Sequence, residues 1–289
     1  MKSYTALRNL YGVLTNNTGT TNLTNGDAWI NDAQRILMST FNPIFTESTA
    51  TDVTVANQQA YNLPYNYEKL NSVTITLGTY KYPLKEVPDE DYWNQLQITT
   101  SFTSNYAQWF FIDAGQINFW PKPSTSSLVI TYNYKVLVRD LSNADYTTGT
   151  IALTNGSTTV TGTGTTFTAA MVGRYLKSNT DGYWYKIAGF TSTTVLTLAK
   201  SFAGTTGSGL AYTIGEMPLV PEAYHQDLVS YATWQYWLTQ ADGAGRAQTY
   251  KDLWEAAIKR CKFDQGNKTN SVAIEEQVPI TNPNLFVSY

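Results

Sequence analysis

Residues 147–215 constrain the fold more than any other part of this chain. The stretch is dominated by Thr, Gly and Ser, and it contains short strand-like runs such as residues 183–190 and 193–202. Asn-Gly, Gly and Ser-Thr turns separate these runs, and this pattern is typical of strands joined by tight connections. We therefore predict that residues 147–215 form a separate small β-domain inserted into the rest of the chain.

Helical periodicity marks the N-terminal segment. Apolar side chains recur there at the spacing of one helix face, at Leu7, Leu10, Tyr11 and Leu14. The Thr-, Asn- and Gly-rich residues 15–26 are expected to break this helix. A second helix is predicted over residues 27–41, since Thr24 and Asp27 resemble a capping box at its start and Pro43 follows its end.

The segment from residue 51 to residue 138 has the pattern of β-strands. One hairpin is expected around Gly78 and another around Asp113–Gly115, with a short helix over residues 88–97 between them. Trp120, Pro121, Lys122 and Pro123 then form a stiff corner directly before an alternating strand over residues 128–136. We interpret this corner as a scaffold element that orients the strand.

A helical hairpin is predicted over residues 221–263, with a turn at residues 242–245 and about five turns in each helix. Residues 266–289 are polar and contain two prolines, which is typical of an extended tail. The predicted fold class is therefore α+β: a helical body, made of N-terminal helices and a C-terminal helix hairpin, with an antiparallel β-region and an inserted small all-β domain. The predicted boundaries are 1–146, 147–215, 216–265 and 266–289.

Composition excludes several classes of function. Charged residues make up only 14% of the 289 residues, well below the roughly 25% of ordinary soluble domains. The net charge of −3 and the absence of clustered Lys and Arg argue against electrostatic binding of duplex DNA. No apolar run is long enough to span a membrane, and no signal peptide is expected at the N-terminus.

No set of residues has the pattern of a catalytic, cofactor or metal site. His225 is the single histidine and Cys261 the single cysteine, so a solvated or interfacial histidine and a buried thiol are the expected roles. The glycines at 162–164 and 204–209 lack the Gly-Lys-Ser/Thr of a phosphate loop. The acidic residues 89–91 fit a helix N-terminus better than an ion site. We expect a protein that is not an enzyme and uses no cofactor.

Four stretches resemble, in their order, the head-to-tail adaptor (connector) proteins of tailed bacteriophages, which form rings beneath the portal. They are DAWINDAQRILMSTF (27–41), AYNLPYNYEKLNSVTI (60–75), QINFWPKPSTSSLVITYNYKV (116–136) and MPLVPEAYHQDLVSYATWQYW (217–237). Their patterns are Y-x-LP, a W-P-x-P corner before an L-x-I-x-Y strand, and a helix of the form P-x-x-Y-x-x-x-L-V-x-Y-A. The insert at 147–215 departs from the family's compact form.

The resemblance implies a structural virion protein that joins the portal to the tail and continues the DNA channel. Its expected partners are the portal ring, tail or nozzle proteins, and further copies of itself in a ring of about twelve. Genomic DNA would pass without sequence-specific binding, and no membrane is involved. The protein would be made in the host cytoplasm and reside at the head–tail junction.

Two sets of residues are assigned to these contacts as hypotheses. The ring interface is expected to use aromatic side chains of the helix hairpin, namely Tyr224, Tyr231, Trp234, Trp237 and Trp254. The tail is expected to be disordered when free and to order against the portal through Pro279, Pro283, Leu285, Phe286 and Tyr289.

Two other functions stay open. The first is a tail or cell-surface protein that binds carbohydrate through the 147–215 module, with Tyr183, Trp184 and Tyr185 as the contact residues. The second is a hydrolase of envelope polysaccharide, which is weaker because no suitably placed pair of acidic residues is evident.

Overall fold

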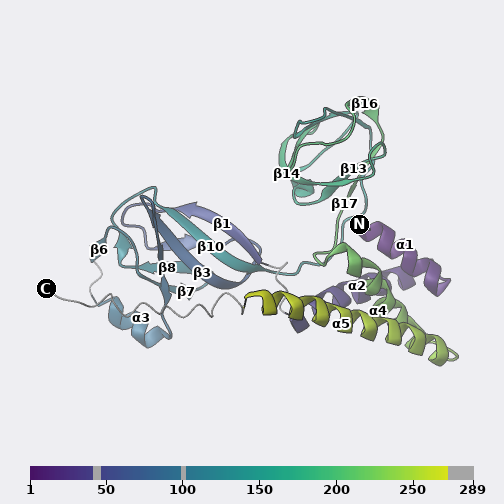
Figure 1. Ribbon diagram of the computed structural model, residues 1–289, viewed down its shortest axis with the longest axis horizontal. Helices are drawn as coiled ribbons and strands as arrows, with labels where there is room; N and C mark the ends of the chain where they lie inside the picture. Colours follow the sequence, from purple (N-terminus) through teal and green to yellow (C-terminus); the bar gives the residue numbers. More distant parts are fainter. Residues whose placement is uncertain (42–46, 99–101, 273–289) are drawn as a thin grey trace. The chain divides into compact units, whose positions relative to one another are not determined.

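The structure is a computed structural model that describes residues 1–41, 47–98 and 102–272. The chain divides into two compact units. One joins Met1–Asn42 to Asp140–Tyr289 and contains the inserted β-module and every α-helix except the short α3, while the other is Pro43–Arg139. The N-terminal helices therefore belong with the C-terminal helices, and the first β-region stands as a unit of its own (Figure 1).

Four helices form the body of the first unit, and α4 packs against each of the other three. Their bounds are Tyr4–Thr15 for α1, Thr20–Phe41 for α2, His225–Leu238 for α4 and Ala244–Val272 for α5. Ser3 caps α1 by accepting a hydrogen bond from the Ala6 amide, and Asn16 ends it in the left-handed region at φ 50°. Leu7 and Tyr11 are fully buried, as the predicted stripe requires.

Helix α2 begins at Thr20, before the predicted capping box at Thr24 and Asp27 and inside the stretch 15–26 that was expected to break the helix. The polar residues at the start of α2 have hydrogen-bond partners in the fold. The side-chain amide of Asn22 donates to the Asn17 carbonyl at 2.7 Å and accepts from the Tyr11 hydroxyl at 2.8 Å. Gly26 lets the Tyr11 ring lie directly against the helix. Tertiary contacts thus outweigh the low helix propensity of this segment.

The predicted helical hairpin is present, but its two helices differ in length. Helix α4 has 14 residues and α5 has 29, where about five turns each were expected. Helix α5 continues to Val272, so residues 266–272 are helical although the sequence assigned them to an extended tail. The remainder of the predicted tail, residues 273–289, lies outside the described residues.

The unit Pro43–Arg139 contains two four-stranded sheets and a short two-stranded pair. The first sheet has the order β1-β10-β3-β4 and the second β2-β8-β7-β5, while β6 pairs with β9. Both hairpins form where predicted, and Ala114 and Gly115 have positive φ in the β7–β8 turn. Two pairs, β5–β7 and β6–β9, are parallel, so the region is not purely antiparallel. The strand bounds are Glu47–Val53 (β1), Ala60–Asn62 (β2), Tyr67–Leu77 (β3), Tyr80–Pro83 (β4), Lys85–Glu86 (β5), Thr103–Ser104 (β6), Trp109–Asp113 (β7), Gln116–Trp120 (β8), Lys122–Pro123 (β9) and Val129–Val136 (β10).

Strand β10 is central in its sheet and follows the Trp-Pro-Lys-Pro corner. It pairs antiparallel with β1 on one side and β3 on the other. Its alternate residues Ile130, Tyr132 and Tyr134 are buried in the core of this unit, as the pattern predicts. Lys122 and Pro123 within the corner pair with Thr103 and Ser104, which ties the corner to the unit.

The short helix α3, Glu90–Leu96, is capped by the Asp89 carboxylate, which accepts from the Tyr92 amide at 2.7 Å.

The inserted module consists of seven strands within Thr150–Gly215, in the order β16-β11-β12-β15-β14-β13-β17. The two terminal members, β16 and β17, are consecutive parts of one segment separated only by Ala211. Because this segment pairs with β11 through its first half and with β13 through its second, the strands close into a small barrel (Figure 1). The bounds are Thr150–Leu153 (β11), Thr159–Thr163 (β12), Tyr175–Ser178 (β13), Trp184–Ser192 (β14), Val195–Leu198 (β15), Gly207–Leu210 (β16) and Tyr212–Gly215 (β17).

Candidate functional site

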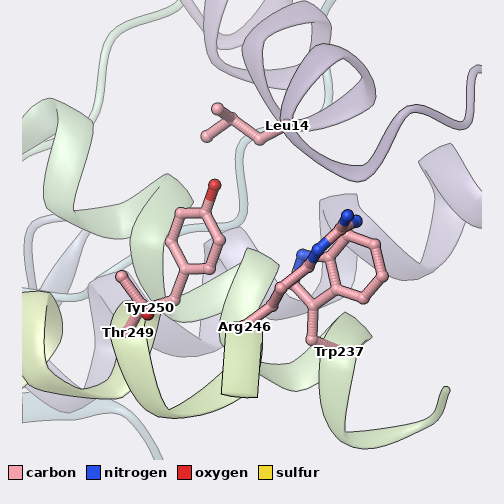
Figure 2. A pocket seen from close by; sticks show the side chains of 5 residues that line it. All are labelled: Leu14, Trp237, Arg246, Thr249 and Tyr250. Carbon is pink, nitrogen blue, oxygen red and sulfur yellow. The ribbon is translucent and has the colours of Figure 1, made fainter. Parts of the chain in front are cut away.

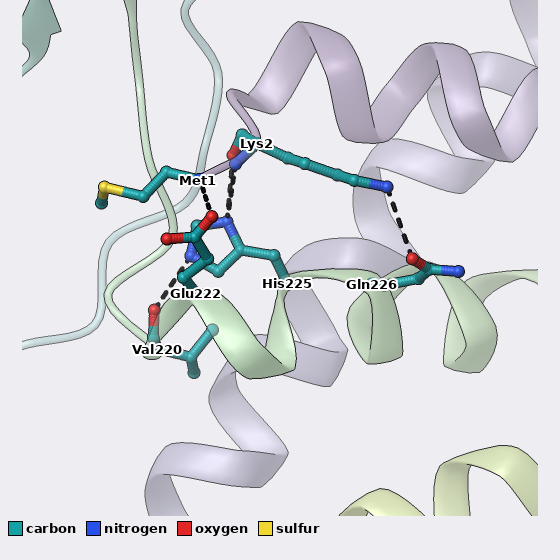
Figure 3. Close-up of polar contacts among 6 residues, drawn as sticks. All are labelled: Met1, Lys2, Val220, Glu222, His225 and Gln226. Carbon is teal, nitrogen blue, oxygen red and sulfur yellow. Dashed lines mark hydrogen bonds and ion pairs between the residues drawn. The ribbon is translucent and has the colours of Figure 1, made fainter. Parts of the chain in front are cut away.

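The single histidine holds the start of the chain against helix α4. His225 is 1% exposed, and its Nε2 lies 3.0 Å from the Val220 carbonyl (Figure 3). Its Nδ1 lies 3.2 Å from the backbone nitrogen of Lys2 and 3.1 Å from the Lys2 carbonyl oxygen. A neutral ring protonated on Nε2 donates to the Val220 carbonyl and accepts from the Lys2 amide. Burial lowers the pKa of His225. The sequence predicted a solvated or interfacial side chain, but the structure gives His225 an internal role.

Neighbouring contacts also hold the first residues of the chain against the start of α4. The amino group of Met1 forms an ion pair with Glu222, and the Lys2 ammonium lies 3.5 Å from the Gln226 side-chain oxygen (Figure 3). The Tyr4 amide donates to the Glu216 carbonyl at 2.8 Å. These contacts join the first residues to the segment that leads from the inserted module into α4.

A second set of contacts holds the two chain segments that connect the module to the helices. The Ser3 hydroxyl donates to the Asp145 carboxylate at 2.8 Å, and the Asp145 amide donates to the Thr5 hydroxyl at 2.9 Å. The guanidinium of Arg174 donates to the Ala144 carbonyl at 2.6 Å and to the Ile214 carbonyl at 3.0 Å. Arg174 therefore bridges the entering and the leaving segment of the module.

A small pocket of about 280 Å³ lies where α1, α4 and α5 meet. Leu14 of α1, Trp237 of α4, and Arg246, Thr249 and Tyr250 of α5 line it (Figure 2). The Arg246 guanidinium stacks over the Trp237 ring, with its central carbon 4.5 Å from the ring centroid. The Trp237 indole nitrogen is buried and has no hydrogen-bond partner among the described residues.

The predicted ring-interface residues fall into two groups. Tyr224 and Trp254 are 6% and 4% exposed, so they contribute to the core of their own chain rather than to its surface. Tyr231 links the groups because its ring centroid lies 5.0 Å from that of Trp254 and 5.6 Å from that of Trp234. Trp234 and Trp237 are half-buried. This burial removes Tyr224 and Trp254 from the predicted interface.

The predicted carbohydrate contacts Tyr183, Trp184 and Tyr185 also differ in placement. Tyr185 faces the barrel core, and its hydroxyl donates to the Asp181 carboxylate at 2.8 Å. Tyr183 is 71% exposed and Trp184 is half-buried. All three line a pocket of about 590 Å³, to which Tyr175, Lys186 and Lys200 also contribute.

Sequence reasoning missed those last three residues. Lys186 stands two residues from Trp184 on the same strand, so strand alternation was a usable signal for it. Tyr175 is brought to the pocket by the pairing of β13 with β14, and Lys200 by the segment that follows β15, so neither can be found from one stretch of sequence.

The predicted portal-binding residues Pro279, Pro283, Leu285, Phe286 and Tyr289 lie outside the described residues. Within the part of the chain that the structure describes, no group of three or more His, Cys, Asp or Glu side chains is placed to hold a metal ion. No helix in these described ranges is long and apolar enough to cross a membrane.

Comparison with known proteins gives one family. The model of the SU10 adaptor protein family matches residues 3–157, which is more than half of the chain. The match includes three of the four stretches on which the resemblance rests, and it ends within the first part of the inserted module. No curated protein matches the chain. The chain therefore belongs to the SU10 adaptor protein family, whose members are structural adaptors of bacteriophages.

Proposed function

We propose that this protein forms a ring at the head–tail junction of its virion, joining the portal to the tail and continuing the DNA channel. Membership of the SU10 adaptor family is the observation that carries the proposal. In this role the protein is structural and non-enzymatic. Its partners are the portal ring on one side, tail or nozzle proteins on the other, and about twelve copies of itself.

The surface of the helical body supports a ring interface. Helices α4 and α5 expose apolar side chains in addition to the half-buried Trp234 and Trp237, namely Leu238 at 58%, Leu253 at 50% and Phe263 at 69%. Aromatic side chains are enriched at interfaces and often dominate the free energy of binding, while the exposed leucines add apolar area that a neighbouring copy would bury. We assign the contact between copies to this surface, which we call the α4–α5 surface.

The charge of the chain is compatible with a DNA channel. A net charge of −3 and the lack of a basic cluster favour passage of DNA without retention.

The portal contact is assigned to the last residues, including Pro279, Pro283, Leu285, Phe286 and Tyr289, which carry apolar side chains for a pocket on a partner.

The test is electron microscopy of the full chain mixed with the portal ring of its virus. The expected result is a symmetric collar on the portal, and deletion of residues 273–289 should abolish docking. A bare portal at protein concentrations well above micromolar would overturn the proposal.

Point variants separate the two contacts. Leu253→Glu and Phe263→Glu place charges on the α4–α5 surface without disturbing a buried side chain. Both should reduce the number of copies per collar. Tyr80→Glu, at a 70% exposed position on β4, is the matched control and should leave the collar complete. Equal collars in all three variants would exclude the α4–α5 surface as the interface.

A further inference from the structure

The outward face of the inserted barrel carries alternating aromatic and basic side chains. Tyr175 lies opposite Lys186 in the pairing of β13 with β14, and Lys177 lies opposite Trp184. Because side chains alternate along a strand, these four share one face. Leu176 and Tyr185, which lie between them, and the next residue Ile187 are buried in the barrel core.

This face contains the pocket of about 590 Å³. Its volume is in the range of about 300–1,000 Å³ typical of small-ligand sites. Tyr175, Tyr183 and Trp184 supply aromatic surface, while Lys186 and Lys200 are its charged members. The pocket thus combines flat apolar walls with positive charge.

Contacts within the module hold the pocket in shape. The Trp184 ring lies over Gly215 of β17, where a Cβ would stand 3.3 Å from the ring, and the Lys177 ammonium is 5.7 Å from the ring centroid. The Tyr185 hydroxyl accepts from the Ala203 amide at 3.2 Å, which fixes the segment that follows Lys200. The Trp184 wall and the segment after Lys200 are therefore in place before any ligand arrives.

Several polar groups of the pocket are left for a ligand. The Tyr175 hydroxyl makes no hydrogen bond with any described residue, and neither Lys186 nor Lys200 forms an ion pair within the described ranges. Both lysines are exposed. An occupant that offers a flat apolar face, hydroxyl groups and one negative charge would satisfy all of these groups.

We propose that this pocket binds a saccharide that carries a carboxylate or a phosphate. The sugar ring stacks on Tyr183 and Trp184, its hydroxyls contact Tyr175, and its acidic group meets Lys200 and Lys186. This assignment is independent of the ring role, because the pocket is built entirely from residues of the inserted module. A nucleic acid strand fits less well, since two lysines do not form a groove that follows a phosphate backbone.

The test is titration calorimetry of the full chain with three probes: oligogalacturonate, its neutral methyl ester, and a mannose 6-phosphate glycan. Tyr183→Ala and Lys200→Gln are the variants, and Tyr80→Ala is a control at a tyrosine of equal exposure. Oligo(dT) is the nucleic acid probe.

The expected result is binding of at least one acidic probe, with little affinity for the neutral ester. The two acidic probes distinguish carboxylate from phosphate. Tyr183→Ala and Lys200→Gln should each weaken binding about tenfold, while Tyr80→Ala should not. Lys200→Gln should also reduce the salt dependence.

Three results would overturn the proposal: no binding of either acidic probe, equal binding by all variants, or binding of oligo(dT) in preference to the sugars. Tyr183→Ala and Lys200→Gln should both leave collar formation on the portal unchanged. The ring role is therefore tested separately from the saccharide pocket.

Discussion

Replacing Gly26 by alanine should destabilise the helical body, although the same change stabilises most helices. In an ordinary helix interior, alanine is favoured over glycine by about 1 kcal/mol. At Gly26, however, a Cβ would lie 2.3 Å from Cε1 and 2.4 Å from Cδ1 of Tyr11. Normal carbon contacts are about 3.5 Å, so the ring would have to move by roughly 1 Å.

The Tyr11 ring has little room for that movement. Its side chain is fully buried, its hydroxyl bonds to Asn22, and its ring meets Trp29 and Tyr236 edge-on, each at 6.3 Å between centroids. Overpacking costs about 1–3 kcal/mol, and loss of the hydrogen bond adds about 1 kcal/mol. After the propensity gain, the free energy of unfolding should fall by about 1–3 kcal/mol.

The assay is thermal and urea unfolding followed by helical circular dichroism. Each kcal/mol corresponds to about 2–4 °C in melting temperature for a unit of this size. Gly245→Ala is the matched control, because Gly245 is exposed in the first turn of α5 and nothing lies within 4 Å of its Cβ position. That variant should be unchanged or slightly more stable. A Gly26→Ala protein as stable as the Gly245→Ala protein would refute the packing argument.

Three further changes test other parts of the structure. Burial lowers the pKa of His225, so the stability it provides is complete above the unfolded pKa of about 6.5 and is lost as the pH falls below it; the urea midpoint should drop between pH 7.5 and 5.5, and less so in His225→Gln. An equal change of the urea midpoint with pH in both proteins would contradict the buried, neutral role of His225. Arg174→Ala removes two charge-assisted hydrogen bonds worth about 1.5–3 kcal/mol each, and chymotrypsin should then cut near Leu141 and Tyr146 faster than in a Lys200→Ala control. Unchanged cleavage rates would show that Arg174 does not hold the connecting segments. Ala114→Asn in the β7–β8 turn should raise the stability of its unit by about 0.5–1 kcal/mol, because asparagine tolerates the φ of 49° better than alanine; a lower urea midpoint would count against this reading of the turn.

Local sequence patterns predicted those elements in which each residue's intrinsic preference matches the burial and backbone conformation that the fold requires. The strand that contains Ile130, Tyr132 and Tyr134 was predictable because one face is buried and strict alternation follows from that. The hairpin turn at Gly115 was predictable because the turn itself requires positive φ. The start of α2 was not, since Asn22 is compatible with a helix only once Tyr11 and Asn17 are in place.

The candidate sites were predictable only in part. The aromatic run at residues 183–185 pointed to the right surface. Alternation turns Tyr185 toward the barrel core, and the sequence did not indicate that Tyr175 also lines the pocket. The ring-interface prediction treated all aromatic residues of the hairpin alike. Which of them face inward depends on how α1 and α2 cover α4, and Trp254 is buried by contacts that no single segment encodes.

Closure of the inserted barrel has a consequence for solubility. A sheet with open edges offers unpaired amide and carbonyl groups to any neighbouring strand, and crowded copies of such a sheet tend to join edge to edge. In this module one continuous segment, from Gly207 to Gly215, forms both β16 and β17, the first and last strands in the strand order. Its pairing with β11 and β13 closes the sheet and leaves only short unpaired edges. Many copies can therefore be held at high local concentration while each module remains a separate body, with its outward faces free to meet other molecules.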